Sequence, residues 1–216
     1  MPITTSMTTS FKTELLSAGH CFNATVNPTG TAASNSPTVT NIATAGIVVG
    51  MGVSGTVIAA GAVVASIDTA TQISLSKNTT AAISGGGVTC AADVFKMALI
   101  KPAMAGTFGA GSTNYTNVGA DEVTGTGYVA GGTALTNVSP TFGGTVAFVT
   151  FTSPSWSNAT FSTAGCMIYN SSKRLDQTGN RACSVHDFGG SQQVSSGTFT
   201  VLMPTADSVN AIIRIS

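Results

Sequence analysis

The sequence feature that most limits the fold is a long stretch, residues 38–90, that contains no phenylalanine, tyrosine or tryptophan, although aromatic residues occur on both sides of it. Short runs of valine, isoleucine and other small residues fill the stretch, and glycine or Asp-Thr-Ala-Thr separates them. Runs of β-branched residues between turn formers favour strands. The stretch therefore predicts a small β module of about five strands, with a thin core because it lacks aromatic side chains.

The flanking residues indicate that this module is inserted into another domain. His20-Cys21-Phe22 would continue naturally into Asp93-Val94-Phe95 if the residues between them were removed. Chains accommodate such insertions where the two ends lie close together at a surface loop. We therefore predict a host β domain of residues 1–22 plus 93–216 and an inserted module of residues 23–92.

Several apolar runs of the host domain have the length and composition of strands. Residues 94–100 and 146–151 are examples, and residues 209–215 alternate between apolar and polar side chains. Alternation with a period of two places every second side chain on the same face of a strand. The last run would thus present one apolar face, made of Val209, Ala211, Ile213 and Ile215.

Only one helix is expected, near the N-terminus. Ser10 is a suitable N-cap for residues 11–16, and Gly19 is a suitable stop. Polar residues 1–9 precede the helix and are expected to form an arm that becomes ordered on a neighbouring molecule. Many short strands favour a sandwich. The predicted fold class is all-β: a β-sandwich or jelly-roll-like host domain with a small inserted β module and one short N-terminal helix.

Residues 164–190 have the pattern of a β-hairpin, with two apolar arms around a polar connector at residues 171–180. Each arm carries one cysteine, and the two lie symmetrically about the middle of the connector. Antiparallel pairing would therefore bring their sulfur atoms close together. The connector is expected to reach toward a partner.

The cysteines allow two interpretations, which the sequence supports about equally. None of the four shows the Cys-x-x-Cys spacing that is typical of zinc sites. They are either buried thiols or two disulfides, and a chain that folds in reducing cytosol would be oxidised only after it leaves that compartment. The disulfide interpretation pairs Cys21 with Cys90 and Cys166 with Cys183.

No catalytic or metal site, and no cofactor, is expected. His186 and Asp187 are adjacent, so strand alternation turns them to opposite faces and they cannot act as a simple dyad. Asp121 and Glu122 are adjacent as well, and a solvated loop is the simpler interpretation of that pair. Glycine-rich segments are not followed by helix-like residues, as a phosphate-binding loop would require. We therefore do not expect an enzyme.

The charge content is unusual: 7% of the residues are charged, against about 25% in ordinary globular proteins, and the charges cancel. Little repulsion keeps copies of such a chain apart, so a homo-oligomer packed among other subunits is expected. Nucleic acid binding needs a basic stripe, which is missing. The apolar residues 43–67 are broken by glycines and predict strands rather than a membrane helix, and residues 1–9 lack the pattern of a signal peptide.

Several segments resemble a family of short structural proteins of tailed bacteriophages, in the same order along the chain. The similarity covers residues 1–22 and 93–216, and the inserted module is similar to a small β module found in many phage virion proteins. The resemblance implies a place in the particle rather than a reaction. The segments are Met1–Leu16, Gly125–Gly132, Pro154–Phe161, Met167–Lys173, Asp187–Gly189 and Asn210–Ile215.

This resemblance leads us to expect a non-enzymatic virion protein, assembled in the bacterial host cytoplasm. The first hypothesis is a decoration or cement protein that stabilises the capsid through contacts with several subunits at once, its partners being the major capsid protein or other virion proteins. The alternative is a neck, collar or tail-fibre protein that binds host glycans, with Trp156 stacked on a sugar. The expected interface residues are Phe11, Trp156, Tyr169, Lys173 and Arg174.

Overall fold

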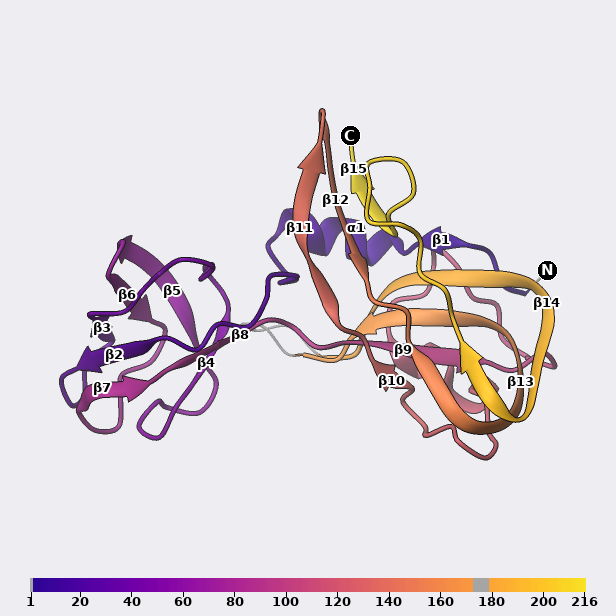
Figure 1. Cartoon of the computed structure of the whole chain (residues 1–216), viewed down its shortest axis with the longest axis horizontal. Helices are drawn as coiled ribbons and strands as arrows, with labels where there is room; N and C mark the ends of the chain where they lie inside the picture. Colours follow the sequence, from indigo (N-terminus) through magenta and orange to yellow (C-terminus); the bar gives the residue numbers. More distant parts are fainter. Residues whose placement is uncertain (1, 173–178) are drawn as a thin grey trace. The chain divides into compact units, whose positions relative to one another are not determined.

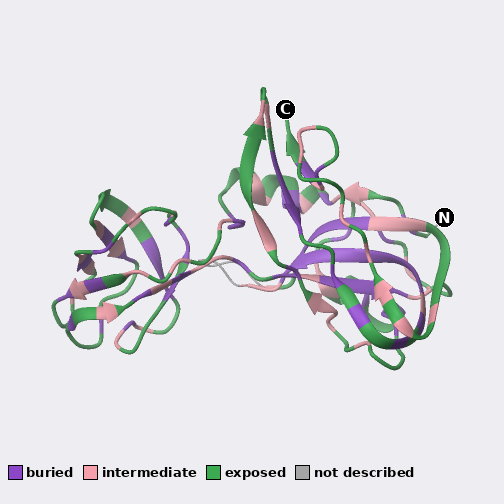
Figure 2. Cartoon of the chain, viewed as in Figure 1, coloured by how far each residue is buried: buried purple, intermediate pink, exposed green. Residues whose placement is uncertain are grey.

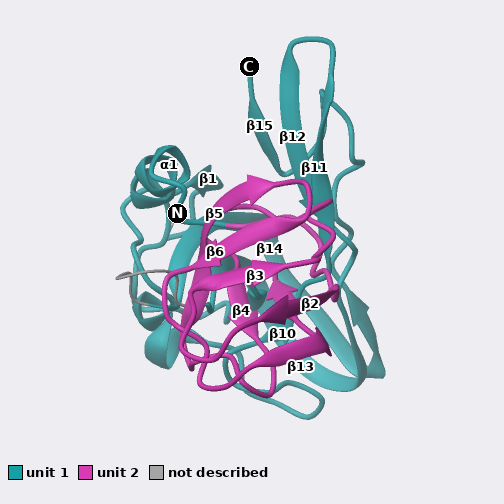
Figure 3. Ribbon diagram, turned by 90° about the vertical axis from the view of Figure 1, so that its left-hand side faces the viewer, with its two compact units in different colours: residues 1–20, 94–173, 178–216 teal, residues 21–93, 174–177 magenta. Residues whose placement is uncertain are grey.

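The computed structural model describes residues 2–172 and 179–216, and it confirms an all-β chain with a single short α-helix: 47% of the residues lie in strands and 7% in helices. The described residues form two compact units (Figure 3). Unit 2 consists of residues 21–93, and unit 1 comprises all the others. Unit 2 begins two residues earlier and ends one residue later than the module expected from the sequence.

Unit 2 is an antiparallel sheet that closes on itself (Figure 1). Its strand order is β7-β2-β3-β6-β5-β4-β8. Cys90 in β8 pairs with Val53 on one side and with Val26, just before β2, on the other. The two ends of the sheet therefore meet at Cys90. The strands are β2 (Thr29–Ala32), β3 (Thr38–Thr40), β4 (Gly52–Ser54), β5 (Ala62–Thr69), β6 (Gln72–Leu75), β7 (Ile83–Gly87) and β8 (Thr89–Ala91).

The core of unit 2 is aliphatic, as the composition of residues 38–90 predicts. Close packing depends on one glycine: a Cβ atom at Gly30 would lie only 2.6 Å from the Cγ1 atom of Val39. The fully buried side chains at the centre of this core are Val39, Ile42, Met51, Val64 and Ile73.

Unit 1 contains two antiparallel sheets, with strand orders β1-β14-β13-β9-β10 and β11-β12-β15. The single α-helix, α1, and two short 3₁₀ helices complete it. The elements are β1 (Ser6–Met7), α1 (Thr9–Leu16), β9 (Phe95–Ile100), η1 (Tyr115–Asn117), η2 (Gly119–Asp121), β10 (Thr133–Ala134), β11 (Asn137–Gly143), β12 (Val146–Phe151), β13 (Ser155–Asn170), β14 (Arg181–Thr200) and β15 (Ile213–Ile215).

The predicted hairpin is confirmed, and it extends much further than the sequence indicated. Strands β13 and β14 pair from Asn170–Arg181 back to Ser155–Thr200 and form a long curled ribbon (Figure 1). Most of the buried residues of the ribbon lie near the connector, whereas its far end is largely exposed (Figure 2).

One large bulge interrupts this ribbon. Thr163 pairs with Gln192, but Gly165, only two residues further along β13, pairs with Asp187, which lies five residues back along β14. Strand β14 thus carries three extra residues within 188–191. Such bulges bend a strand and redirect its side chains. The bulge opens the hollow described below.

The N-terminal segment belongs to this fold, so the expectation of a detached arm at residues 1–9 is wrong for its described part. Strand β1 pairs with β14 at Val185 and Ser184, and Ile3 forms a parallel bridge with Phe108. Ile3 is buried, and a Cβ atom at Gly165 would lie 2.7 Å from its Cδ1 atom. Residues 2–8 are therefore an edge segment that contains the short strand β1 and has one side chain, Ile3, anchored in the core.

Helix α1 is present but has different caps from those predicted. The N-cap is Thr8, whose Oγ1 atom accepts a hydrogen bond from the Phe11 N–H, so Ser10 lies inside the first turn. At the other end Ala18 adopts the left-handed conformation, with φ 55°, and Gly19 N–H bonds to the carbonyl of Glu14. These bonds form the Schellman motif that commonly ends helices.

The last predicted strand is shorter than the alternation of residues 209–215 suggested. Only β15 is extended, because the Asp207 carboxylate accepts hydrogen bonds from the N–H groups of Val209 and Asn210 and folds the preceding residues into a turn. Of the four side chains predicted to share a face, Ala211 and Ile213 are buried, whereas Val209 and Ile215 are exposed.

Candidate functional site

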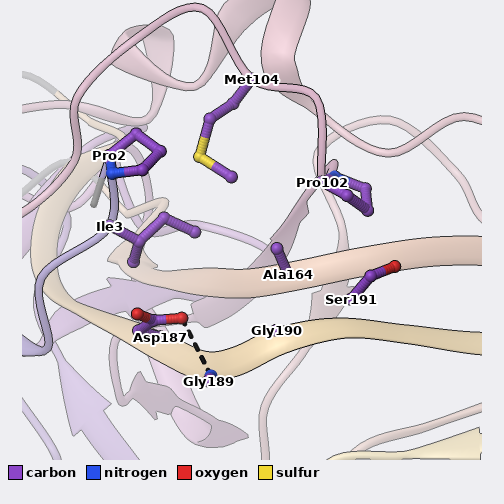
Figure 4. Close-up of a pocket in the computed structure, with 9 residues that line it drawn as sticks. All are labelled: Pro2, Ile3, Pro102, Met104, Ala164, Asp187, Gly189, Gly190 and Ser191. Carbon is purple, nitrogen blue, oxygen red and sulfur yellow. Dashed lines mark hydrogen bonds between the residues drawn. The ribbon is translucent and has the colours of Figure 1, made fainter.

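One concave feature of unit 1 is a hollow of about 220 Å³ beside the bulge of β14 (Figure 4). The edge segment before β1, the loop after β9, and strands β13 and β14 each contribute to its wall. Most of the wall is apolar, and the glycines of the bulge leave backbone exposed. The lining residues are Pro2, Ile3, Pro102, Met104, Ala164, Asp187, Gly189, Gly190 and Ser191.

The size of this hollow limits what it can bind. Sites for small organic ligands and cofactors usually have volumes of about 300–1,000 Å³. A hollow of about 220 Å³ accommodates one long side chain better than a cofactor. It is therefore better suited to contact with another polypeptide.

Asp187 supplies the charge at this hollow. Its Oδ1 atom accepts a hydrogen bond from Gly189 N–H, 2.9 Å away (Figure 4), and its own N–H donates to the Oγ1 atom of Thr5. The first bond holds the carboxylate against the bulge. The carboxylate has further lone pairs, since an ionised carboxyl group has about four acceptor sites.

His186 does not work together with Asp187, as strand alternation predicted. His186 pairs with Cys166 and Asp187 with Gly165, so the two side chains leave opposite faces of the ribbon. The Nε2 atom of His186 lies 2.9 Å from the Oγ atom of buried Ser184. Burial lowers the pKa of His186 to about 4, so the imidazole is neutral at neutral pH.

The expectation of a solvated loop at Asp121 and Glu122 is wrong. Asp121 is the last residue of η2, and Glu122 follows it. Both side chains are buried. The Asp121 carboxylate accepts hydrogen bonds from the N–H groups of Ala105 and Gly106 and forms an ion pair with Lys101 at 3.3 Å. These backbone hydrogen bonds, and more weakly Lys101, lower the pKa of Asp121. Asp121 thus fixes the loop that carries Met104.

Glu122 is the centre of a polar cluster that the sequence did not reveal. Its carboxylate accepts hydrogen bonds from the hydroxyls of Tyr115 at 2.5 Å and Tyr128 at 2.6 Å, and from Gly131 N–H at 2.7 Å. Tyr169 donates to the Gly131 carbonyl and stacks on Tyr115. Burial, and then Glu122, raise the pKa of Tyr115 to about 12, so its hydroxyl remains a donor. Two of the three tyrosines therefore bind one buried carboxylate, and the third, Tyr169, packs against this cluster.

A second polar cluster fastens helix α1 to the ribbon. Glu14 lies 2.7 Å from the Nε2 atom of His20 and 3.5 Å from the Nη1 atom of Arg181. Arg181 also donates to the Gly19 carbonyl, and the amide nitrogen of Asn170 lies 2.8 Å from the Nδ1 atom of His20. Desolvation raises the pKa of Glu14, although the arginine opposes this shift. We interpret this cluster as structural.

The four cysteines, all within the described residues, are buried thiols and form no disulfide. The pairing of Cys166 with Cys183 is wrong because of the register: Cys166 lies opposite His186, three residues further along β14. Because Cys183 and His186 are three residues apart on β14, their side chains lie on opposite faces of the strand. Cys21 and Cys90 are both buried in the core of unit 2 but are not bonded to each other.

The residues expected at an interface are buried within the chain where the structure describes them. Phe11 and Tyr169 are core residues, and Trp156 is only 6% exposed. The Trp156 ring contacts those of Tyr128 and Phe199, with ring centres 6.3 and 6.0 Å apart, so it is not presented to a sugar. The remaining two, Lys173 and Arg174, lie outside the described residues.

The sequence pointed to one member of the hollow, Asp187, but not to the hollow itself. The available signal was the Gly189-Gly190 pair inside a strand pattern, because isolated glycines in strands often mark bulges. The contributions of Pro2 and Met104 depend on tertiary contacts that no local pattern encodes.

Comparisons of the chain with protein-family models, with curated proteins and with solved structures find no match. Within residues 2–172 and 179–216, no helix has the length and apolar character needed to span a membrane. In the same part of the chain, no group of three or more His, Cys, Asp or Glu side chains is arranged to hold a metal ion.

Proposed function

We propose that this chain is a non-enzymatic structural protein of a bacteriophage virion, and more specifically a decoration or cement protein on the outside of the capsid. In this role the protein stabilises the shell because each copy contacts several subunits at once. Its partners are the major capsid protein or other virion proteins, and further copies of the chain itself. It acts by binding, without catalysis.

One observation carries this proposal: segments that resemble phage structural proteins meet at the hollow. Pro2 and Ile3 come from the N-terminal segment of the resemblance, and Asp187 and Gly189 come from another segment, almost 190 residues along the chain. They line the same concave surface. A shared binding surface is a direct physical reason for such distant segments to resemble one family together.

Two further features support a role in assembly. The hollow suits one side chain better than a small molecule, as argued above. The low content of charged residues, 7%, leaves a surface of hydroxyls, amides and backbone that packs against neighbours at little desolvation cost. Both features are expected of a subunit that is surrounded by other subunits.

The alternative function, host-glycan binding by a neck, collar or tail-fibre protein, depended on an accessible Trp156. That side chain is packed between Tyr128 and Phe199. No other observation favours a sugar site, so we retain the decoration role.

Purified particles of the phage that encodes this chain provide the test. We expect mass spectrometry to detect the chain in the particles and immunogold electron microscopy to place it on the head. Particles that lack the chain should release DNA at a lower temperature. If the chain is missing from purified particles the proposal fails, and gold confined to the tail or neck would favour the alternative.

A further inference from the structure

We propose that the hollow and the adjoining edge of β14 together bind an extended segment of a partner protein that carries a lysine or arginine side chain. The segment would add a strand to β14 and place its long basic side chain in the hollow. This inference rests on the proposed function, since it describes how the protein is held to its partner.

The first observation is the open edge of β14. On one side β14 pairs with β13 from Arg181 to Thr200, with interruptions at the bulges, but on the other it pairs with β1 only at Ser184 and Val185. Among the described residues, no strand lies beside residues 188–200 on that second side. Most of these residues are exposed. An open edge offers unpaired N–H and C=O groups to an incoming strand.

The second observation is that no charged residue and no proline blocks this edge, and that a regular stretch of it follows the bulge. Proteins usually protect exposed edges with charged residues, proline or bulges. Strand β11, the edge of the smaller sheet, has Pro140 and an irregular register after Val138. Residues 188–200 contain no proline and no charged residue, and residues 192–194 pair in regular register with β13, between the bulge at 188–191 and the register shifts nearer the far end of the ribbon. The edge of β14 is thus suited to pairing.

The third observation is the chemistry of the hollow, which lies where this edge begins. Pro2, Pro102 and Met104 form apolar walls that suit a chain of methylene groups. Beside them is the Asp187 carboxylate, for which the described residues provide only the Gly189 N–H as a partner. Lysine and arginine combine an apolar stem with a charged end. A partner with such a side chain is complementary to both parts of the hollow.

The molecule itself uses the same mode of binding at the neighbouring position. Its N-terminal segment pairs with β14 through Ser6 and Met7 and anchors one side chain, Ile3, against Gly165. Added strands of this kind gain affinity from main-chain hydrogen bonds and specificity from side-chain pockets. The proposed partner segment would continue this arrangement along the same edge.

A peptide-binding experiment on the full chain tests the proposal. The probe is a fluorescein-labelled peptide, Gly-Thr-Val-Lys-Val-Thr-Gly, measured by fluorescence anisotropy against two analogues with norleucine or glutamate in place of lysine. We expect the lysine peptide to bind about tenfold more tightly than the norleucine peptide, since a charge-assisted hydrogen bond is worth somewhat more than 1 kcal/mol. The glutamate peptide should bind most weakly.

Variants and modified peptides separate the two parts of the site. D187N keeps the acceptor for Gly189 but removes the charge, so it should abolish the preference for lysine over norleucine. D68N removes an exposed charge in unit 2 and should leave the preference unchanged. Methylation of the peptide N–H groups along one edge should prevent binding, whereas methylation along the other edge should be tolerated. Equal binding of the lysine and norleucine peptides, or of both methylated peptides, would overturn the proposal.

Self-association is the competing outcome. If sedimentation shows that the chain dimerises and the peptide dissociates the dimer, the occupant of the edge is a second copy and the proposed partner is wrong. The proposed function fails separately, by absence of the chain from virions. A chain found in virions whose D187N variant is incorporated normally and still prefers the lysine peptide would leave the function standing and remove this inference.

Discussion

The two units are stabilised in different ways. Unit 2 closes its sheet and fills it with aliphatic side chains, and its described residues, 21–93, include three charged ones, Asp68, Lys77 and Asp93. Unit 1 leaves the edge of β14 open and buries two polar clusters, centred on Glu122 and on Glu14. A closed sheet has no edge to offer. The open edge on which the proposed recognition depends thus belongs to unit 1, which also contains both polar clusters.

The unfolding of each unit can be followed separately, because the units differ in aromatic content. Trp156 and all three tyrosines belong to unit 1, so tryptophan fluorescence and near-ultraviolet circular dichroism report on that unit. Unit 2 can be followed by hydrogen exchange of peptides from β5 and β6. Each prediction below uses this separation.

The largest effect is expected when the centre of the tyrosine cluster is removed. E122A leaves three partly buried donors without an acceptor: two tyrosine hydroxyls and Gly131 N–H. Each costs about 1–3 kcal/mol, so the variant should lose about 5 kcal/mol, which is enough to unfold many domains. Tryptophan fluorescence should show unit 1 unfolded or melting far earlier, while hydrogen exchange in unit 2 stays slow.

The matched control is E122Q, which keeps an acceptor oxygen and the shape of the side chain. It should lose much less stability than E122A. If E122A melts like the unaltered chain, the cluster does not hold unit 1 together. Loss of protection in both units at once would show that they unfold as one, and the comparison would fail.

Much of the fold was predictable because it depends on local patterns. Residues 38–90 lack aromatics and contain short β-branched runs, and they form the expected small β unit with an aliphatic core. The hairpin over residues 164–190 and the single helix were also visible. The errors concern ends: Thr8 replaces Ser10 as the helix cap, and Asp207 folds the start of the last strand into a turn. Such ends depend on individual hydrogen bonds that several residues could have made.

The site was much less predictable, for a physical reason. Asp187 was noticed, but the hollow also needs Pro2 and Met104, which tertiary contacts bring to it. Likewise, no local pattern shows that Tyr115 and Tyr128, 7 and 6 residues from Glu122, would bind its carboxylate, or that Tyr169 would stack on Tyr115. The symmetric cysteines misled because the register of β13 and β14 differs from that of a simple hairpin. Register is set by bulges and packing as well as by the hydrophobic pattern.

In unit 2, the corresponding test is I73A. Ile73 is fully buried and pairs with Val39 and Ile67. Replacement by alanine leaves a cavity and should cost about 3–5 kcal/mol. Hydrogen exchange in β5 and β6 should accelerate while tryptophan fluorescence is unchanged. I67A is the control: Ile67 is 40% exposed, so its replacement should cost much less. Similar losses for both variants would contradict a specific aliphatic core.

Acidification should lower the stability of unit 1 more than that of unit 2, by less than the substitutions above. The pKa of His186, in unit 1, is lowered by burial from 6.5 to about 4, so the folded state favours the neutral imidazole. The resulting stability is complete above pH 6.5 and is lost as the pH falls toward 4, by about 2–3 kcal/mol at one pKa unit per 1.4 kcal/mol. Unit 2 has no histidine. Thermal melts between pH 7 and pH 4 should therefore show unit 1 weakening before unit 2.

H186Q supplies the control for this pH dependence, because glutamine does not titrate. Its unit 1 should weaken less between pH 6.5 and 4 than that of the unaltered chain. Glu14 acts in the opposite direction: its raised pKa means that its contribution declines as the pH rises above about 4.5. An unchanged slope in H186Q would show that His186 does not cause the acid sensitivity of unit 1 in this pH range.

The smallest effect is expected for alkylation of the cysteine thiols. The rate of alkylation measures how often the protein around each thiol unfolds locally, not the free energy of unfolding itself. Burial raises the pKa of Cys90 to about 11 and that of Cys166 to about 12, so little reactive thiolate exists at neutral pH. Intact mass after iodoacetamide treatment should show almost no labelling of the folded chain and four labels after denaturation. In E122A, only Cys166 and Cys183, which lie in unit 1, should react. Labelling of Cys21 together with them would mean that opening of unit 1 also opens unit 2, and a reducible dimer would place a disulfide between copies.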